Sequence, residues 1–209
     1  MSPPPVSNLD TAFSTWSLGD QLVTPKGGKI CLLSSNGSRV TLQPSAIPVL
    51  TPFAPSTFYK QLSGRINLSL QCSDAMIAYF ECLDAWTKDY VHAHAERLLK
   101  EPTTREEIEA GYHSPVSRSG EYLPLLRTKI TLDGPKVCKF WGSDGKPRAV
   151  PEDWKYVGLR PAISISHLYI MGKEFGWVIL CTDLEICDTP PPVSPFARPS
   201  ALEDEDESM

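Results

Sequence analysis

The stretch Leu126-Arg127-Thr128-Lys129-Ile130-Thr131-Leu132 decides the fold class, because its side chains alternate between an apolar and a basic face. Successive side chains of a β-strand point to opposite faces of the sheet, so Arg127 and Lys129 would lie on the face opposite the core. The segment Lys136–Trp141 follows across Asp133-Gly134-Pro135. We expect the two segments to pair as a hairpin whose outer surface carries basic and aromatic side chains.

Other segments also read as strands. Residues 65–70 alternate in the same way, with Arg65 at the basic end of the outer face. Residues 29–33 and 39–43 are short β-prone runs, and Asn36-Gly37 between them favours the positive-φ turn of a hairpin. We expect the final pair, residues 161–171 and 175–186, to turn back at Gly172-Lys173 and to close a barrel.

Proline restricts one apolar segment of the N-terminal half. Residues 47–53 contain Pro48 and Pro52, and Pro55 follows shortly afterwards. Proline lacks the backbone N–H that a ladder needs, so this segment is predicted to be an edge strand or a crossing segment.

The pattern becomes helical from Asp74 to about Leu99. Apolar residues there fall near one stripe, and Ser73 or Asp74 can cap the first turn. Pro102 ends the helix, and residues 105–109 read as a short exposed helical turn. The fold class predicted is therefore mainly β with one long helix, an α+β protein with an oligonucleotide-binding (OB) type barrel.

The chain is predicted to form one domain with two tails, since its 209 residues suit a single core. Residues 1–15 carry three consecutive prolines and are expected to form a flexible arm. Residues 16–187 are expected to form the OB-fold-like domain. Residues 188–209 are Pro-rich and acidic, and they are expected to be disordered because they cannot bury enough apolar area.

The net charge of −5 conceals two regions of opposite sign. Residues 188–209 hold one base, Arg198, and six acids, a local balance of −5. Residues 127–160 hold eight bases and four acids, a local balance of +4. A protein needs positive charge only where it touches phosphate, so the overall acidity does not exclude nucleic-acid binding.

The cysteines and apolar runs indicate the setting in which the protein works. The six cysteines are scattered without a Cys-x-x-Cys pair, as expected of reduced core thiols. We expect an intracellular, reducing compartment: nucleus, cytoplasm or a viral replication site. No segment is apolar for long enough to cross a membrane as a helix, and the start of the chain lacks the pattern of a secretion signal. His92 and His94 point in different directions on a helix, so no metal and no cofactor are expected.

The order of these elements resembles that of the single-stranded-DNA-binding proteins of short-tailed coliphages and their relatives in large eukaryotic DNA viruses. The resemblance lies in Gly64–Leu70 running into the Asp74 helix, in Tyr122–Ile130, in Ile165–Ile170 with Gly176–Leu180, and in the acidic run Glu203–Glu207. It implies a barrel with the helix packed over it, a groove that binds single strands without sequence preference, and a tail that recruits replication proteins. This tail ends in Ser208-Met209, where that family often has an aromatic residue after its acids.

Single-strand binding also has independent support in the residues themselves, because it needs cations along a backbone path and aromatic faces on which bases stack. The aromatic candidates are Trp141, Trp154 and Tyr156, whereas Trp86 and Trp177 are predicted to belong to the core. The acidic tail, Glu203, Asp204, Glu205, Asp206 and Glu207, is predicted to dock partners or to occupy the basic groove when DNA is absent. The candidate cations are Arg65, Arg127, Lys129, Lys139, Lys146, Arg148, Lys155 and Arg160.

The function predicted is sequence-nonspecific single-stranded DNA binding in replication, recombination or repair, without enzymatic chemistry. The alternative is a β-rich structural or scaffolding protein whose acidic tail interacts with partners and which does not bind DNA. An enzyme is the weaker reading, because no nucleophile, base and orienting group appear together; the acidic pair Glu152-Asp153 reads as loop. A homodimer is left open.

Overall fold

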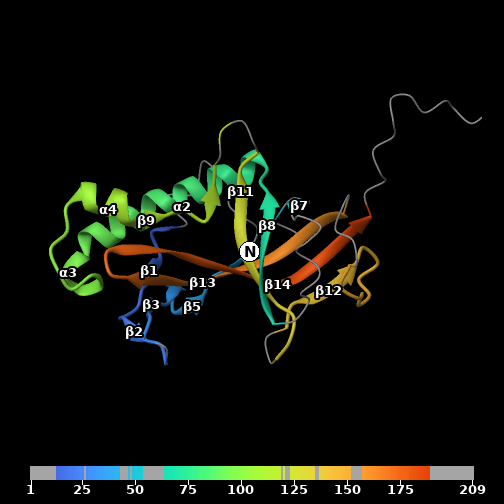
Figure 1. Cartoon of the computed structure of the whole chain (residues 1–209), viewed down its shortest axis with the longest axis horizontal. Helices are drawn as coiled ribbons and strands as arrows, with labels where there is room; N and C mark the ends of the chain where they lie inside the picture. Colours follow the sequence, from blue (N-terminus) through green and yellow to red (C-terminus); the bar gives the residue numbers. More distant parts are fainter. Residues whose placement is uncertain are drawn as a thin grey trace, which may run out of the picture.

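The computed structural model describes residues 13–25, 27–42, 47, 49–53, 64–118, 120, 123–134, 137–151 and 157–188 (Figure 1). Within this part the protein is mainly β, with three helices between the eighth and ninth strands. The helices are α2 (Asp74–Ala93), α3 (Ala95–Leu98) and α4 (Arg105–Gly111). The strands are β1 (Trp16–Leu18), β2 (Leu22–Val23), β3 (Lys29–Cys31), β4 (Leu33–Ser35), β5 (Ser38–Arg39), β6 (Thr41–Leu42), β7 (Thr51–Phe53), β8 (Arg65–Gln71), β9 (Tyr112–His113), β10 (Val116–Ser117), β11 (Leu125–Thr131), β12 (Lys139–Gly142), β13 (Val157–Met171) and β14 (Glu174–Asp188).

Five strands form the centre of the main sheet, in the order β7-β8-β11-β14-β13. The pairs are antiparallel except for β11 and β14, which are parallel. If these five strands are numbered 1 to 5 by their order along the chain, their order in the sheet is 1-2-3-5-4. This is a Greek-key arrangement of the OB type. The predicted α+β fold of this type is therefore confirmed.

The predicted closure of the barrel is wrong, because the main sheet stays open. The ladder stops at β7, and the one described backbone link from there to β13 is a bridge between Leu50 and Leu159, with N···O distances of 2.6 and 2.7 Å. The β7 strand is only three residues long and contains Pro52, which has no N–H to donate. The prediction of an edge strand here is confirmed, since β7 ends the strand order.

The segment after β11 does not fold back as the predicted hairpin. The N–H of Cys138 donates to the carbonyl of Thr131 at 2.7 Å, and β12 then continues along β14. Both β11 and β12 are parallel to β14. The reason is the length of β14, whose one edge accommodates β9, β11 and β12 in succession.

The helical region begins and breaks at identifiable caps. The Ser73 hydroxyl accepts the N–H of Met76 and starts α2, as predicted, whereas the helix ends at Ala93 and a separate short helix follows His94. A capping box between Thr104 and Glu107 starts α4. No described helix is long and apolar enough to cross a membrane.

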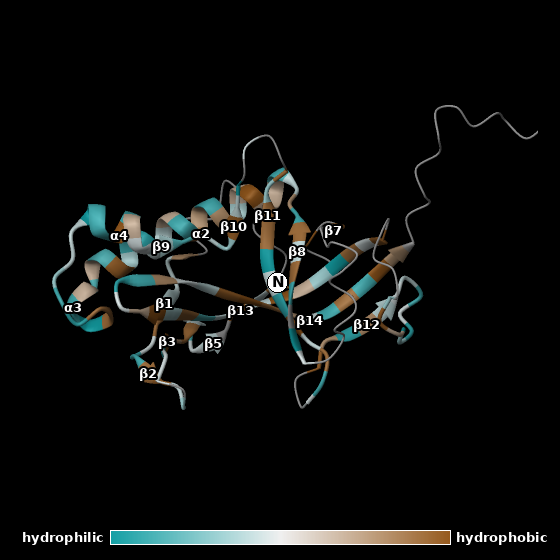
Figure 2. Ribbon diagram, viewed as in Figure 1, coloured by the Kyte–Doolittle hydropathy of each residue, from teal (hydrophilic) through white to brown (hydrophobic). Residues whose placement is uncertain are grey.

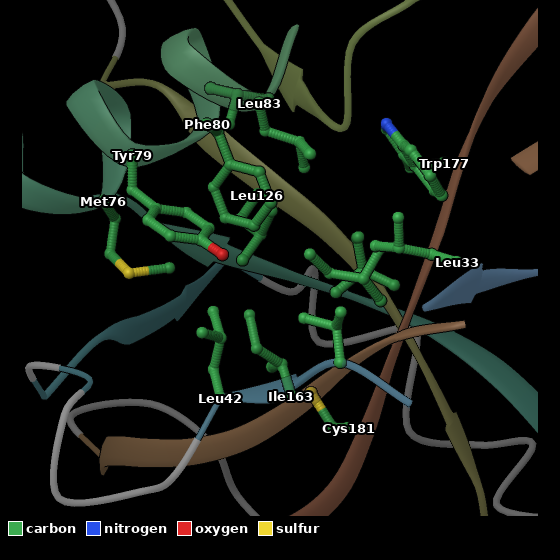
Figure 3. Packing of buried hydrophobic residues seen from close by; sticks show 14 of the residues in the cluster. Leu33, Leu42, Met76, Tyr79, Phe80, Leu83, Leu126, Ile163, Trp177 and Cys181 are labelled. Carbon is green, nitrogen blue, oxygen red and sulfur yellow. The ribbon is translucent and has the colours of Figure 1, made fainter. Parts of the chain in front are cut away.

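The core lies between α2 and the sheet. Figure 3 shows Phe80 and Leu83 of α2 facing Leu126 of β11. Trp177 of β14 is 5% exposed, which confirms its predicted core position, and its Nε1–H donates to Thr87 of α2 at 2.8 Å. Hydrophobic and hydrophilic residues are interspersed along β11, as expected of a strand with one covered face (Figure 2).

The N-terminal part contributes to this core as well. Phe13 is 3% exposed and packs on Trp16 and Trp86, so the folded residues include part of the segment predicted to be an arm. The predicted turn at Asn36-Gly37 joins β4 and β5, and both of its residues have positive φ. Residues 1–12 and 189–209, which contain most of the two predicted tails, lie outside the described residues.

Candidate nucleic-acid interface

The outer surface of β8 and β11, here called the basic face, carries three of the predicted cations. The inward residues of both strands are buried, so the alternate side chains turn to the other side of the sheet. Cross-strand pairing places Arg127 opposite Ser69, Lys129 opposite Asn67 and Thr131 opposite Arg65. These six residues constitute the basic face, and neither strand contains an acidic residue.

Arg65 and Lys129 are close enough to influence each other's charge. Partial burial, and secondarily the nearby Arg65 guanidinium, lower the pKa of Lys129 below its ordinary value. Neither side chain forms a hydrogen bond or an ion pair with another described residue. Two like charges without a described acidic partner form a place where an anion would be stabilised.

Arg127 has a fixed orientation at the other end of the basic face. Its guanidinium donates to the backbone carbonyl of Ser114 at 2.6 Å. Its charge also reaches Tyr169 of β13, whose pKa is raised chiefly by burial. Arg127 thus retains its positive charge while one of its N–H groups holds it in place.

Tyr169 is an aromatic candidate that sequence reasoning missed. It pairs with Gly176, and a Cβ built on that glycine would lie 2.9 Å from the Tyr169 hydroxyl and 2.6 Å from the carbonyl of His113. The glycine therefore lets the half-buried phenol ring lie close across the sheet. Sequence reasoning missed Tyr169 because its position opposite Gly176 becomes visible only once the register of β13 and β14 is known.

A second group of predicted residues surrounds β12. Lys139 and Arg148 are exposed, and Trp141 is half-buried with its Nε1–H donating to Asp183 at 2.9 Å. All three line a recess of about 400 Å³ whose other walls are largely apolar. Trp141 also lines a second recess of about 480 Å³, which contains Asp183 and Glu185.

Ion pairs between described residues involve two of the predicted cations. Arg160 pairs with Glu185 at 2.8 Å, and Lys146 lies 3.6 Å from Asp144 in an exposed turn. An ion pair reduces the positive charge that either cation offers to a phosphate, so both are weaker candidates than Arg65 or Lys129. Trp154, Lys155, Tyr156 and the acidic run Glu203–Glu207 lie outside the described residues.

The described cysteines and acids do not form a reactive or metal-binding cluster. None of the six cysteines forms a disulfide in the described part of the chain, and burial raises the pKa of Cys72 to about 11 and that of Cys181 to about 12. Thiols with raised pKa values are poor nucleophiles at neutral pH. Within the described ranges no group of three or more His, Cys, Asp or Glu side chains could hold a metal ion.

The fold and this surface define an OB-type α+β protein with a basic outer face. Among solved structures, the chain is similar to gp2.5, a single-stranded DNA binding protein encoded by bacteriophage T7. The TM-score is 0.46 at 14% identity, over 78% of this chain and 96% of that chain. No family model and no curated protein sequence matches the chain.

Proposed function

We propose that this protein binds single-stranded DNA without sequence preference and performs no chemistry on it. The observation that carries the proposal is the position of Arg65, Arg127 and Lys129 on the outer face of the second and third strands of an OB-type sheet. This is the face with which OB folds bind oligonucleotides. Phosphate oxygens would neutralise the adjacent charges of Arg65 and Lys129, and this would release counterions from the strand.

The same surface explains why binding should not depend on sequence. Phosphate contacts carry no sequence information, and aromatic rings stack on every base because every base has a π-face. Tyr169 beside Arg127, and Trp141 beside Lys139, combine an aromatic ring with a cation. Such pairs suit a single strand better than a duplex, whose bases are already stacked.

The biological setting is a further part of the proposal. Coating of single strands would serve DNA replication, recombination or repair, with the acidic run Glu203–Glu207 recruiting replication proteins. Six cysteines without a disulfide suit an intracellular, reducing compartment. A homodimer would place two basic faces on one strand and would raise the avidity for it.

Fluorescence anisotropy of a labelled oligo-dT and of its duplex counterpart, at two salt concentrations, tests the proposal. We expect tight, salt-sensitive binding to the single strand and weak binding to the duplex. If neither the full chain nor a variant without residues 189–209 binds the single strand or the duplex at low salt, the proposal is wrong and a structural or scaffolding role is favoured.

A further inference from the structure

The recess beside β12 combines apolar walls with a cationic rim. Val137, at 41% exposure, and the partly buried Leu132 and Val150 form its apolar part. Lys139 and Arg148 line it as well, and both side chains are exposed. Its volume of about 400 Å³ lies within the range of roughly 300 to 1,000 Å³ that small-molecule sites occupy.

The chemistry of this recess selects a group that is flat and apolar at one end and negatively charged at the other. Apolar walls with a half-buried indole favour an aromatic ring, and the two cations favour an anion beside it. No acidic side chain is among the described residues that line this recess, whereas Asp183 and Glu185 line the recess on which Trp141 also borders. Charge therefore directs a phosphate-bearing ligand to the first recess rather than the second.

We propose that the recess holds one unstacked nucleobase of a bound single strand, with Lys139 and Arg148 on the flanking phosphates. The inference rests on the proposed single-strand binding and adds the place where a base is held. A nucleotide joins an aromatic ring to a phosphate, as the lining requires. The bond from Trp141 to Asp183 holds the indole, so Asp183 is a positioning residue.

The recess also continues the path of the basic face. Leu132 follows β11 directly, its N–H donates to the carbonyl of Gly64 at 2.9 Å, and it lines the recess. Gly64 immediately precedes Arg65 in the chain. The recess therefore begins at the end of the β8–β11 ladder that carries Arg65. A strand whose phosphates follow Arg127, Lys129 and Arg65 would reach the recess next.

Filling the recess with a side chain tests the proposal. Val137→Trp places a large ring at a half-exposed position, and Val23→Trp is the matched control, on the 69% exposed residue of β2. Figure 1 shows β2 toward the left of the molecule and β12 toward the right. The probes are oligo-dT and an abasic strand of the same length. Thermal unfolding of both variants checks that each is folded.

We expect Val137→Trp to weaken oligo-dT binding by at least about fivefold, the equivalent of one lost stacking contact. The salt dependence and the affinity for the abasic strand should match those of the wild type, and Val23→Trp should change neither. Unchanged affinity of Val137→Trp for oligo-dT, or equal losses on the two strands, would overturn the base-holding role alone. A wild-type protein that binds neither strand would instead remove the proposed function, and the recess inference with it.

Discussion

Single residues of the basic face differ in how free their charges are. Arg65 and Lys129 repel each other without a described acidic partner, Arg127 is held by a carbonyl, and Arg160 is paired with Glu185. The sequence identified these residues as equivalent cations. The partners of each side chain rank these residues as phosphate-binding candidates, because an ion pair reduces the positive charge that a residue offers to a phosphate.

Arg65→Ala and Lys129→Ala should each lower the affinity for oligo-dT of any sequence. Each removed phosphate contact should reduce the slope of log K against log salt by about 0.7, the value for single strands. Arg105→Ala is the matched control, because Arg105 lies on α4 in an exposed ion pair with Asp89. Anisotropy titrations at several salt concentrations measure the slope, and equal slopes for all three variants would contradict the assignment.

The lowered pKa of Lys129 predicts a pH dependence of binding. Its neutral form becomes populated at a lower pH than that of an ordinary lysine, and phosphate binds the charged form. Affinity should therefore fall as pH rises through this lowered pKa. Lys129→Arg, which keeps its charge, should bind with less alkaline weakening than the wild type. Identical pH profiles would show that Lys129 does not meet phosphate.

Tyr169→Leu should weaken single-strand binding by about five- to tenfold, because it removes one aromatic face but little apolar volume. The salt slope should stay unchanged, in contrast to the alanine variants of the cations. Tyr59 and Tyr156 lie outside the described residues and therefore offer no matched control. Tyr90→Leu on α2 serves as the control, because that ring packs on Trp86. A loss that is equal in the two variants would indicate a general effect on folding.

At the scale of elements, α2 is joined to the sheet by a polar contact as well as by the core. Thr87 is fully buried, accepts the Trp177 indole N–H at 2.8 Å and donates to the carbonyl of Leu83 at 2.6 Å. The sequence predicted Trp177 to be in the core, and it placed an apolar stripe on the helix. Which helix residue meets the indole depends on how the helix lies across the sheet.

Thr87→Val should lower the free energy of unfolding by about 1 to 3 kcal/mol, the cost of a buried donor that loses its acceptor. The side chains have nearly the same shape, so little cavity forms. Urea denaturation of Thr87→Val, Trp177→Phe and the double variant measures the coupling, and we expect the double variant to lose less than the two single losses combined. Strict additivity would show that the two groups do not interact.

At the scale of the whole molecule, positive and negative charges are separated along the chain. The acidic run Glu203–Glu207 balances a basic middle region, part of which forms the outer face of the sheet. Carboxylates on a tail compete with phosphate for the same cations, and salt screens this competition. The net charge of −5 thus gives no information about the sign of the face that would meet DNA.

Truncation after Asp188 should tighten binding to oligo-dT at low salt, with a smaller gain at high salt. Asp188 is kept because it pairs with Val157 at the end of β14. The control replaces the five acids at 203–207 by serine in the full-length chain, which removes the charge but keeps the length. Equal affinity of the wild type and both variants would exclude competition by the tail.

The sequence alone was sufficient for the α+β class, the N-terminal end of the long helix, the turn at Asn36-Gly37 and the alternation that turns Arg127 and Lys129 outward. These features depend on neighbours along the chain, through side-chain period, capping and turn conformation. Only the tertiary structure decided that β12 continues along β14, that the sheet remains open at Pro52, that Arg65 lies on the face that carries Lys129, and that Tyr169 comes near Arg127. Those features depend on which edge of a strand is available to a segment far away in sequence, and no local pattern encodes that choice.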